Sequence, residues 1–414
     1  MKKALIALMA LALVAAFAMP AAAAEKSEVS FGGYVAFDTW VVDADEPALD
    51  MDGDGVFDDG AYDDTDLIWQ QDAICSRFNA SFKRENFTGF VEIRPRTESN
   101  QGQEAQIRHF YAEWNFGPGY LLLGQTWAPS FMPISSSVGP YGGGCSADAG
   151  DTGYGSGRDP MIQLRFPFSI GQFQLAFMDP TQGGSRNIPD DGVLGNVSDD
   201  EDYMLPRVEA KLGLNFGPVA FNICGGWLEY EEVYRNQDLD NDLDETEFDV
   251  EAWIAAANIK FTGGPFSIAM SGWVGENPME YGYFGGTERG SGAQVLMPTA
   301  WIEDRDGDGI FETSADVDAW GAYISATFKL NDMVSFAAGG GTREFEGDYD
   351  GLTITDETTH YYVNATITLA EGFTITPEIG EYDYDTTDFD TPGNSVSQDE
   401  GDDFYYGIWW KMNF

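Results

Sequence analysis

The strongest constraint in this sequence is an alternation of apolar and polar residues with a period of two, which recurs along most of the chain. In one segment Val208, Ala210 and Leu212 share a face, while Glu209 and Lys211 share the other. Successive side chains of a β-strand point to opposite faces, so the pattern indicates strands with one apolar and one polar face. Sixteen such strands are predicted, at 30–43, 67–83, 87–97, 106–116, 119–128, 161–169, 171–180, 203–216, 219–231, 248–262, 265–276, 317–330, 333–345, 358–370, 373–384 and 402–414.

The connections between these strands alternate between short and long without exception. Those after even-numbered strands are tight turns, such as Gly117-Pro118 and Gly217-Pro218. Those after odd-numbered strands are long and acidic, at 44–66, 98–105, 129–160, 181–202, 232–247, 277–316, 346–357 and 385–401. Outer-membrane barrels have short periplasmic turns and long extracellular loops, whereas a soluble sandwich has no reason to sort its loops in this way. We therefore predict an all-β fold, a transmembrane antiparallel β-barrel of about 16 strands.

Composition limits the classes of function. Asp and Glu total 70 against 21 Lys and Arg, and the formal net charge is −49. Such a chain lacks the cationic face that nucleic-acid binding requires. It is not a disordered polyacid either, because 43% of its residues are apolar and 14% aromatic.

The N-terminus carries an export signal. Lys2 and Lys3 precede an apolar run that ends in the small residues Ala21 to Ala24, the pattern of a cleaved secretory signal peptide. We predict a signal peptide at 1–24 and a single barrel domain at 25–414, located in a bacterial outer membrane. No later stretch approaches the roughly 20 apolar residues of a membrane helix.

The last strand carries the most specific mark. Tyr406, Ile408, Trp410, Met412 and Phe414 alternate with more polar or small positions, and the chain stops on the terminal Phe. This strand resembles the C-terminal assembly signal of outer-membrane β-barrels, which the barrel assembly machinery reads. Together with the strand count and the long third loop, it makes the chain similar to the homotrimeric general porins of Gram-negative bacteria, in particular those of sulfate-reducing bacteria.

The resemblance implies a function and partners. It implies a water-filled channel for passive diffusion of small hydrophilic solutes and ions, a homotrimer, and a barrel embedded in outer-membrane lipid and lipopolysaccharide. It also implies that the loop after the fifth strand, 129–160, folds into the barrel and constricts it opposite a basic wall. The loop lacks the Pro-Glu-Phe-Gly-Gly segment of enteric porins, so this transfer is positional.

Alternation assigns residues to that constriction. The basic residues expected on the lumen side of the wall are Arg77, Lys83, Arg94, Arg96, Arg165, Arg207, Lys211 and Arg343. The acids expected on or beside the loop are Asp148, Asp151 and Asp159. Opposed arginines and carboxylates would create a transverse field that favours polar solutes, although a solvated wall paired with loop carboxylates is the alternative. Arg108 has the parity of Phe110, which predicts a place at the outer rim.

Two acidic loops resemble short calcium-binding loops. They contain Asp-x-Asp-Gly-Asp-Gly and offer Asp50, Asp52, Asp54 and Asp58 in the first loop, and Asp304, Asp306, Asp308 and Glu312 in the sixth. Closely spaced carboxylates with glycines suit Ca²⁺, but neither loop has the bidentate Glu of an EF-hand. The alternative is a solvated acidic loop. No cofactor is required for the predicted function.

Three cysteines are too few for a disulfide scaffold. Cys75 and Cys224 have lumen parity, and Cys145 lies in the expected constriction loop. In an oxidising compartment a disulfide can tether that loop to the wall, and small buried thiols are the alternative.

The sequence also leaves alternatives to a general diffusion channel. A solute-specific channel would be favoured if 281–303 formed another hairpin and raised the count to 18 strands. A Ca²⁺-dependent surface or adhesion barrel would explain the acidic loops but not the basic lumen faces. An enzyme is not expected, because the chain has two histidines, His109 and His360, and no Gly-x-Ser-x-Gly nucleophile elbow.

Overall fold

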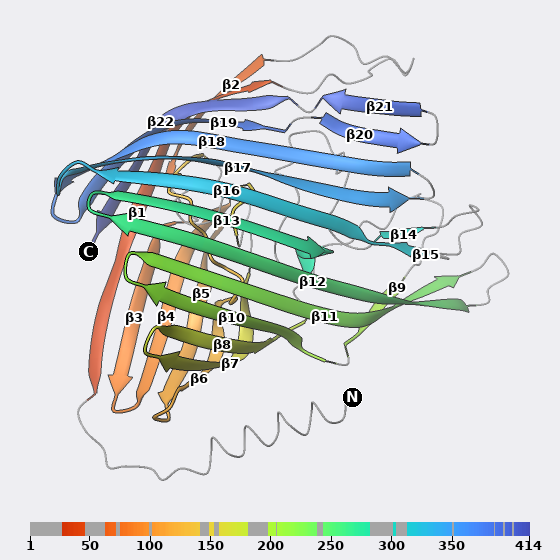
Figure 1. Cartoon of the computed structure of the whole chain (residues 1–414), viewed down its shortest axis with the longest axis horizontal. Coiled ribbons are helices and arrows are strands. Elements are labelled where there is room, and N and C mark those ends of the chain that lie inside the picture. Colours follow the sequence, from red (N-terminus) through yellow and green to blue (C-terminus); the bar gives the residue numbers. More distant parts are fainter. Residues whose placement is uncertain are drawn as a thin grey trace.

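Sixteen antiparallel strands form the wall of a closed β-barrel in the computed structural model (Figure 1). The structure describes residues 27–45, 63–71, 75–98, 102–140, 149–152, 157–180, 198–203, 205–237, 243–281, 301–303, 313–349, 352–384, 386–391, 394–399 and 401–414. The wall strands are β1 (Glu28–Asp45), β3 (Arg77–Arg84), β4 (Phe87–Glu98), β5 (Gly102–Asn115), β6 (Tyr120–Trp127), β7 (Arg158–Phe168), β8 (Gly171–Met178), β10 (Arg207–Phe216), β11 (Val219–Gln237), β12 (Leu243–Gly263), β13 (Phe266–Glu276), β16 (Val317–Lys329), β17 (Val334–Tyr349), β18 (Leu352–Ala370), β19 (Phe373–Asp383) and β22 (Asp402–Asn413).

The barrel closes between its first and last strands. β1 pairs antiparallel with β22, with Phe37 opposite Trp410 and Tyr34 opposite Asn413. Closure gives both outermost strands a hydrogen-bonded neighbour, which a membrane-spanning sheet requires because lipid offers no substitute. The predicted fold class and strand number are confirmed.

Seven tight turns gather at one end of the barrel, at 85–86, 116–119, 169–170, 217–218, 264–265, 330–333 and 371–372. Gly117, Gly217 and Gly264 have φ of 102°, 61° and 59°, a left-handed conformation that glycine adopts without steric cost. The other connections lie at the opposite end (Figure 1). Two of them, 99–101 between β4 and β5 and 350–351 between β17 and β18, are as short as the turns, so the predicted sorting of connections by length holds only in part. We call the two ends of the barrel the turn end and the loop end.

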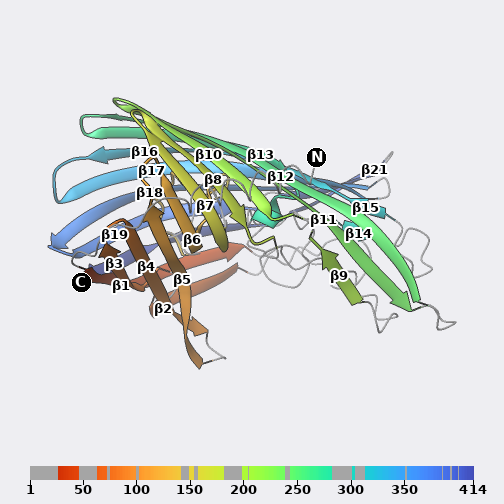
Figure 2. The ribbon, with the colours of Figure 1, turned by 90° about the horizontal axis from the view of Figure 1, so that it is seen from below.

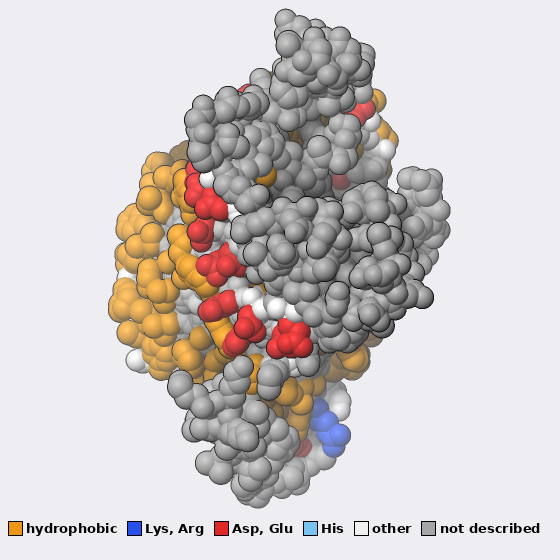
Figure 3. All heavy atoms as spheres, turned by 90° about the vertical axis from the view of Figure 1, so that its right-hand side faces the viewer, with side chains coloured by type: hydrophobic (Ala, Val, Ile, Leu, Met, Phe, Trp, Pro, Cys, Tyr) orange, Lys and Arg blue, Asp and Glu red, His pale blue; other side chains and the backbone are white. Residues whose placement is uncertain are grey.

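The outer face of the barrel is apolar. Ile324, Val363 and Met270 are exposed on it, while their strand neighbours Tyr323 and Tyr362 are buried inside. Figure 3 shows part of this apolar surface on the side of the barrel that faces the viewer. An apolar exterior with alternating inward residues is the pattern of a lipid-facing wall. No helix in the described ranges is long and apolar enough to cross a membrane.

A belt of carboxylates follows this apolar surface toward the loop end, and Figure 3 shows acidic side chains beside the apolar ones. In the strand register Asp318 lies opposite both Glu276 and Glu346. Glu229 likewise lies opposite Glu251. Like charges directly opposite each other on one sheet face repel.

The predicted strand bounds differ from the structure in a few places. The second predicted strand, 67–83, is interrupted: β2 (Asp63–Gln71) and β3 are separate strands that pair with successive parts of β1. β11 and β12 continue into the acidic stretch 232–247, which we had expected to be a loop, and β17 and β18 extend into 346–357. Hydrogen bonding to the partner strand holds these polar ends in the sheet despite their low β-propensity.

Short elements outside the wall lie in the long connections. They are β9 (Ser198–Asp202), η1 (Pro278–Tyr281), β14 (Trp301–Glu303), β15 (Thr313–Ala315), β20 (Thr386–Thr391) and β21 (Asn394–Asp399). β14 and β15 pair with each other in a separate two-stranded sheet. The wall itself has 16 strands, so the 18-strand alternative is not formed.

Candidate functional site

A segment after β6 lies inside the barrel and is held there by inward-facing side chains. We call residues 128–140 and 149–152 the strap. The Ser130 amide donates to Glu209 Oε2 on β10 (2.9 Å), and Asn258 Nδ2 on β12 donates to Met132 O (2.8 Å). Further along, the Ser136 amide donates to the Tyr362 hydroxyl on β18 (2.9 Å). The strap therefore crosses the interior of the barrel and contacts β10, β12 and β18. In Figure 1 its yellow trace lies within the outline of the barrel.

Glu378 on β19 anchors the far end of the strap. Its buried carboxylate accepts hydrogen bonds from Ser137 Oγ (2.8 Å) and from the Val138 amide (2.9 Å). Two wall residues, Asn364 and Tyr405, donate to the same carboxylate at 2.8 and 2.9 Å. A buried carboxylate with several donors is well compensated, so Glu378 fixes the strap to the wall.

Asp151 organises the strap internally. Its Oδ2 accepts from the amides of Ile134 and Ser135 at 2.7 and 2.8 Å, and its Oδ1 accepts from Ser271 Oγ on β13 at 2.8 Å. The Asp151 side chain is fully buried. Asp151, predicted as an acid of the constriction loop, thus lies in the strap. Its carboxylate accepts hydrogen bonds from backbone amides of the strap and from the Ser271 hydroxyl of the wall.

Glu92 on β4 is the centre of a group of basic residues. Arg108 Nε lies 3.0 Å and Arg77 Nη1 3.4 Å from Glu92 Oε1, and His109 Nε2 lies 3.9 Å from the same oxygen. Arg158, at the start of β7, is within electrostatic range of Arg77, Arg94 and Arg108. We call Arg77, Arg94, Arg108 and Arg158 the basic cluster.

Aromatic stacking connects the basic cluster to the strap. The Arg158 guanidinium lies 3.9 Å from the centroid of Trp127, and Trp127 stacks on Phe131 of the strap at 3.7 Å. Within the described residues, Arg158 forms no ion pair and its buried Nε has no hydrogen-bond partner. Arginine stacks favourably on an indole face, so Trp127 positions this charge without neutralising it.

A β-bulge explains the position of Arg108, which we had expected at the outer rim. The β4–β5 register shifts between Glu92, opposite His109, and Ile93, opposite Ile107. Arg108 is therefore the extra residue and is buried against Glu92. Counting by parity fails here because a bulge places two residues of one strand opposite one of the other.

The other predicted basic residues are distributed along the wall. Arg165 pairs with Glu113 at 2.8 Å, and Arg207 contacts Asp159 and lies 3.4 Å from Glu209. Arg343 is buried, with Nη2 3.3 Å from Thr358 Oγ1. Lys83 is exposed near the turn end and Lys211 is half-buried on β10. Arg96 belongs to β4, and Asp148 lies outside the described residues.

Only part of the predicted set therefore comes together. Arg77 and Arg94 join the basic cluster, whereas Asp159 is occupied by Arg207 and Asp151 by backbone amides. Sequence reasoning missed Arg158, which lies just inside the stretch expected to be a loop. The one signal in the sequence that could have identified Arg158 is its position just before the sixth predicted strand, 161–169.

Both predicted calcium loops, at 50–58 and 304–312, lie outside the described residues. In the described part of the chain no cluster of three or more His, Cys, Asp or Glu residues is arranged to hold a metal ion. Cys75 is disulfide-bonded and Cys224 is free and buried, while Cys145 lies outside the described residues.

The residues of the predicted assembly signal share the outer face of β22. Tyr406, Met412 and Phe414 are exposed there, whereas Tyr405 and Trp409 are buried on the inner face. The Phe414 amide donates to Gly33 O at 3.1 Å, which joins the chain end to β1. The predicted alternation in this strand is correct.

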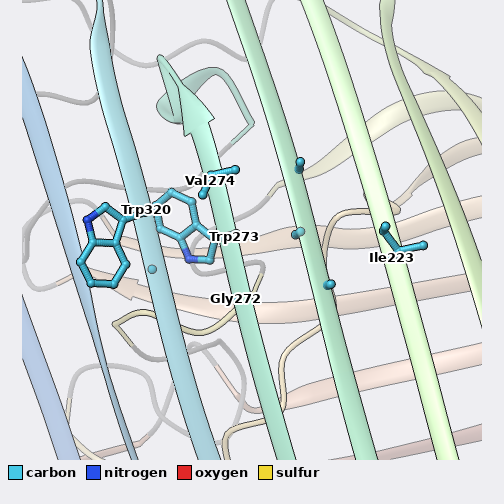
Figure 4. Close-up of a pocket in the computed structure, with 9 residues that line it drawn as sticks. Ile223, Gly272, Trp273, Val274 and Trp320 are labelled. Carbon is cyan, nitrogen blue, oxygen red and sulfur yellow. The ribbon is translucent and has the colours of Figure 1, made fainter.

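A cavity of about 450 Å³ (Figure 4) opens on the outer face, not in the interior. Its lining spans β11 to β16 and includes Ile223, Ala255, Gly272, Val274 and Trp320. Val274 and Trp320 are 47% and 38% exposed on the lipid-facing side. This outer groove has no charged residue in its lining and is compatible with lipid.

Fold and site together define a class of protein: a bacterial outer-membrane barrel whose interior is crossed by a strap beside basic residues. The family model described as Gram-negative porin matches residues 10–387. The chain belongs to the Gram-negative porin family and forms an outer-membrane porin channel.

Solved structures of outer-membrane proteins have the same fold. The outer-membrane channel DcaP of Acinetobacter baumannii is 16% identical, with a TM-score of 0.58 over 95% of this chain and 100% of that one. The trimer form of OmpT of Vibrio cholerae is 13% identical (TM-score 0.53, 94% and 100% covered). The anion-selective porin from Comamonas acidovorans is 8% identical (TM-score 0.53, 94% and 100% covered). A search of curated proteins finds no match.

Proposed function

We propose that this porin is a passive, water-filled channel for small hydrophilic solutes and ions, and that it favours anions. The observation that carries the proposal is the convergence of four guanidinium groups, those of Arg77, Arg94, Arg108 and Arg158, beside the strap. Rings and walls of arginine select anions in pores because they replace part of the hydration that an anion loses in a narrow passage.

The positions of the acidic residues also favour selectivity for anions. Asp151 and Asp159, which would have opposed the arginines across the lumen, are engaged with backbone amides and with Arg207. Glu92 compensates one of the four guanidinium charges, so the basic cluster acts on a passing ion through a net positive field and not through a balanced transverse field. A solute carboxylate or phosphate would gain charge-assisted hydrogen bonds from the guanidinium groups.

The carboxylates at the loop end have the opposite effect on selectivity, because they favour cations. Carboxylates such as Asp318 and Glu346 attract cations near this end of the barrel. Their influence reaches only about 8 Å at physiological ionic strength and shrinks further as salt rises. Anion preference is therefore expected to strengthen with salt concentration until the basic cluster itself is screened.

Further features complete the proposal. Residues 1–24 act as a cleaved signal peptide, and the outward residues of β22 serve as the signal for the barrel assembly machinery. The mature barrel is a homotrimer, which the trimer form of the similar structure, OmpT of Vibrio cholerae, supports. In the outer membrane this trimer contacts lipopolysaccharide. The acidic loops at 50–58 and 304–312 either bind Ca²⁺ or remain solvated. Calorimetric titration of Ca²⁺ into wild type and into D304N/D306N would distinguish the two alternatives.

The test is the reversal potential of the refolded protein in planar bilayers under a KCl gradient. We expect Cl⁻ to be favoured, and Arg158→Gln to lower the anion-to-cation permeability ratio about threefold, which corresponds to roughly 0.7 kcal/mol of lost attraction. Arg84→Gln is the matched control, because Arg84 is exposed beside a turn. Cation preference in the wild type would contradict the selectivity, and absence of conductance from folded protein would contradict the channel.

A further inference from the structure

Lys411 on β22 is an inward-facing cation near the turn end of the barrel. It has the parity of Tyr405 and Trp409, which are buried on the inner face. Glu378, which anchors the strap, lies opposite Gly407, so Lys411 is four residues nearer the turn end than the strap anchor. Figure 2 shows the C-terminus, which follows β22, beside β1 and β3. Lys411 therefore faces the lumen on the same side of the barrel as the basic cluster.

One aromatic ring connects Lys411 to the basic cluster. The Lys411 ammonium lies 4.1 Å and the Arg77 guanidinium 4.8 Å from the centroid of Tyr34 on β1. The Lys411 ammonium also lies 5.5 Å from the centroid of Trp409. Cations are attracted to the faces of aromatic rings, so Tyr34 holds two positive charges close together without neutralising either of them. We call Lys411, Tyr34 and Arg77 the Tyr34 site.

Lys411 has no acidic neighbour, unlike the other cations on this side of the lumen. Arg77 contacts Glu92, and Arg165 pairs with Glu113. Within the described residues Lys411 forms no ion pair, and the one charged group that acts on it is Arg77. Two positive charges over one ring repel each other, and a bound anion would remove that repulsion. The Tyr34 site therefore has the charge of an anion-binding site and lacks a carboxylate to fill it at Lys411.

The basic cluster leads to this site from the strap. Arg108 and Arg158 are both within electrostatic range of Arg77, which is also the neighbour of Lys411. An anion that leaves Arg158 for the turn end can thus remain beside a cation until it reaches Lys411. The Tyr34 site is a second position, below the strap, at which a permeating anion can be held.

We propose that the Tyr34 site binds the phosphate group of small phosphate monoesters as they pass through the barrel. This inference rests on the proposed channel and names a class of solute for it. A phosphate monoester carries a charge of about −1.5 to −2 at pH 7 and three acceptor oxygens, which match an ammonium and a guanidinium group at separate positions. A carboxylate carries one charge and is matched by a single bidentate guanidinium group. The pair of unlike cations therefore favours phosphate over carboxylate.

Block of the chloride current in planar bilayers tests the site. The probes are glycerol 3-phosphate, a phosphate monoester, and lactate, a monocarboxylate. We expect glycerol 3-phosphate to halve the current at a concentration about fivefold lower than lactate, because its phosphate gains charge-assisted hydrogen bonds from two cations. Lys411→Gln should remove this preference, and Lys411→Arg should keep it. Equal half-blocking concentrations of the two probes in wild type would overturn the proposal.

The matched control is Lys260→Gln. Lys260 shares the inward face of β12 with Asn258, lies near the turn end and is exposed. This variant should keep the preference for glycerol 3-phosphate. Tyr34→Leu, which leaves both charges but removes their common ring, should weaken the preference, whereas Tyr34→Phe should not. A preference that survives Lys411→Gln but disappears in Arg158→Gln would assign the binding to the basic cluster and overturn the Tyr34 site.

Titration calorimetry separates this inference from the channel itself. Folded protein in detergent, identified by its heat-modifiable mobility, should bind glycerol 3-phosphate about fivefold more weakly after Lys411→Gln but not after Lys260→Gln. This result would support the Tyr34 site even if the wild type failed to conduct or favoured cations, because those two outcomes contradict only the proposed function. Equal affinity in wild type and Lys411→Gln would overturn the Tyr34 site even in a conducting, anion-selective channel.

Discussion

The amide of Val138 and the carboxylate of Glu378, 240 residues apart in the sequence, are joined by a hydrogen bond of 2.9 Å. Val138 belongs to the strap inside the barrel, and Glu378 belongs to β19 on the wall. Ser137, Asn364 and Tyr405 donate to the same carboxylate. The position of the strap therefore depends on a contact that no local sequence pattern contains.

Glu378→Ala is expected to release this end of the strap. Hydrogen bonds to a charged group contribute about 1.5–3 kcal/mol each, so losing the two that hold the strap is expected to lower the free energy of unfolding by about 3–6 kcal/mol. Single-channel conductance should rise and become noisier, because the strap no longer has a fixed position. Glu371→Ala, in an exposed turn, is the control. Unchanged conductance in Glu378→Ala would mean that the strap is held without this anchor.

Gly150→Ala tests the other end of the strap. Gly150 has φ of +80°, and a Cβ there would lie 2.3 Å from Thr342 O and 2.5 Å from Ala322 O. We expect the strap to move away from β16 and β17, with altered conductance. Gly217→Ala is the matched control: it has the same sign of φ (+61°) but open space around it. The control should lose about 1–3 kcal/mol of stability through strain alone and conduct normally. Equal effects on conductance would contradict close packing of the strap at Gly150.

The acidic belt predicts that salt stabilises the protein. Asp318 lies opposite Glu276 and Glu346, and such like-charge pairs are unfavourable by about 0.2–1 kcal/mol each. Because salt screens this repulsion, the melting temperature should rise with NaCl, and Asp318→Asn should raise it most at low salt. Circular dichroism melts in detergent at several salt concentrations measure both effects. A melting temperature that falls with salt would contradict the repulsion.

Asp332→Asn is a control for this measurement, because it should lower the melting temperature that Asp318→Asn raises. The hydrogen bond from Lys329 at 2.8 Å holds the pKa of Asp332, in an exposed turn, below its usual range. A lowered folded-state pKa contributes stability above the unfolded pKa of about 3.8, and the contribution is lost as pH falls through the folded value. Asp332→Asn should therefore slightly lower the melting temperature at pH 7 and have no effect at strongly acidic pH.

The number of free thiols per chain tests the disulfide of Cys75 directly. Because Cys75 is disulfide-bonded and Cys224 is free, alkylation of unfolded, unreduced protein should label one thiol per chain, and reduction should expose three. We expect mass spectrometry of the unreduced digest to join the Cys75 peptide to the one that carries Cys145. Cys224→Ser should remove the single free thiol. Three free thiols in wild-type protein from the outer membrane would contradict the disulfide.

Much of the fold was predictable because its determinants are local. A period of two specifies which face each strand residue joins, and turn residues such as Gly217 and Gly264 mark where the chain reverses. Both kinds of signal repeat in every hairpin, so an error in one does not spread to the next. The sixteen wall strands and the outward face of β22 follow from these patterns.

The site was predictable only in part, because its geometry depends on departures from those patterns. One extra residue in β5 turns Arg108 inward, and only the register between two strands reveals it. Arg158 becomes part of the basic cluster because the end of β6 places Trp127 beside it. Asp151 was expected from sequence to face the lumen, yet nearby amides within the strap capture its carboxylate.

The sequence by itself determined that this chain crosses an outer membrane as a barrel, since alternation, turn spacing and the terminal strand are properties of consecutive residues. Only the tertiary structure decided where the strap lies and which charges remain near the channel. Those features arise from contacts between residues tens to hundreds of positions apart, such as Val138 with Glu378 and Arg77 with Glu92. Closure of the barrel brings such pairs together, and their hydrogen bonds then fix the interior.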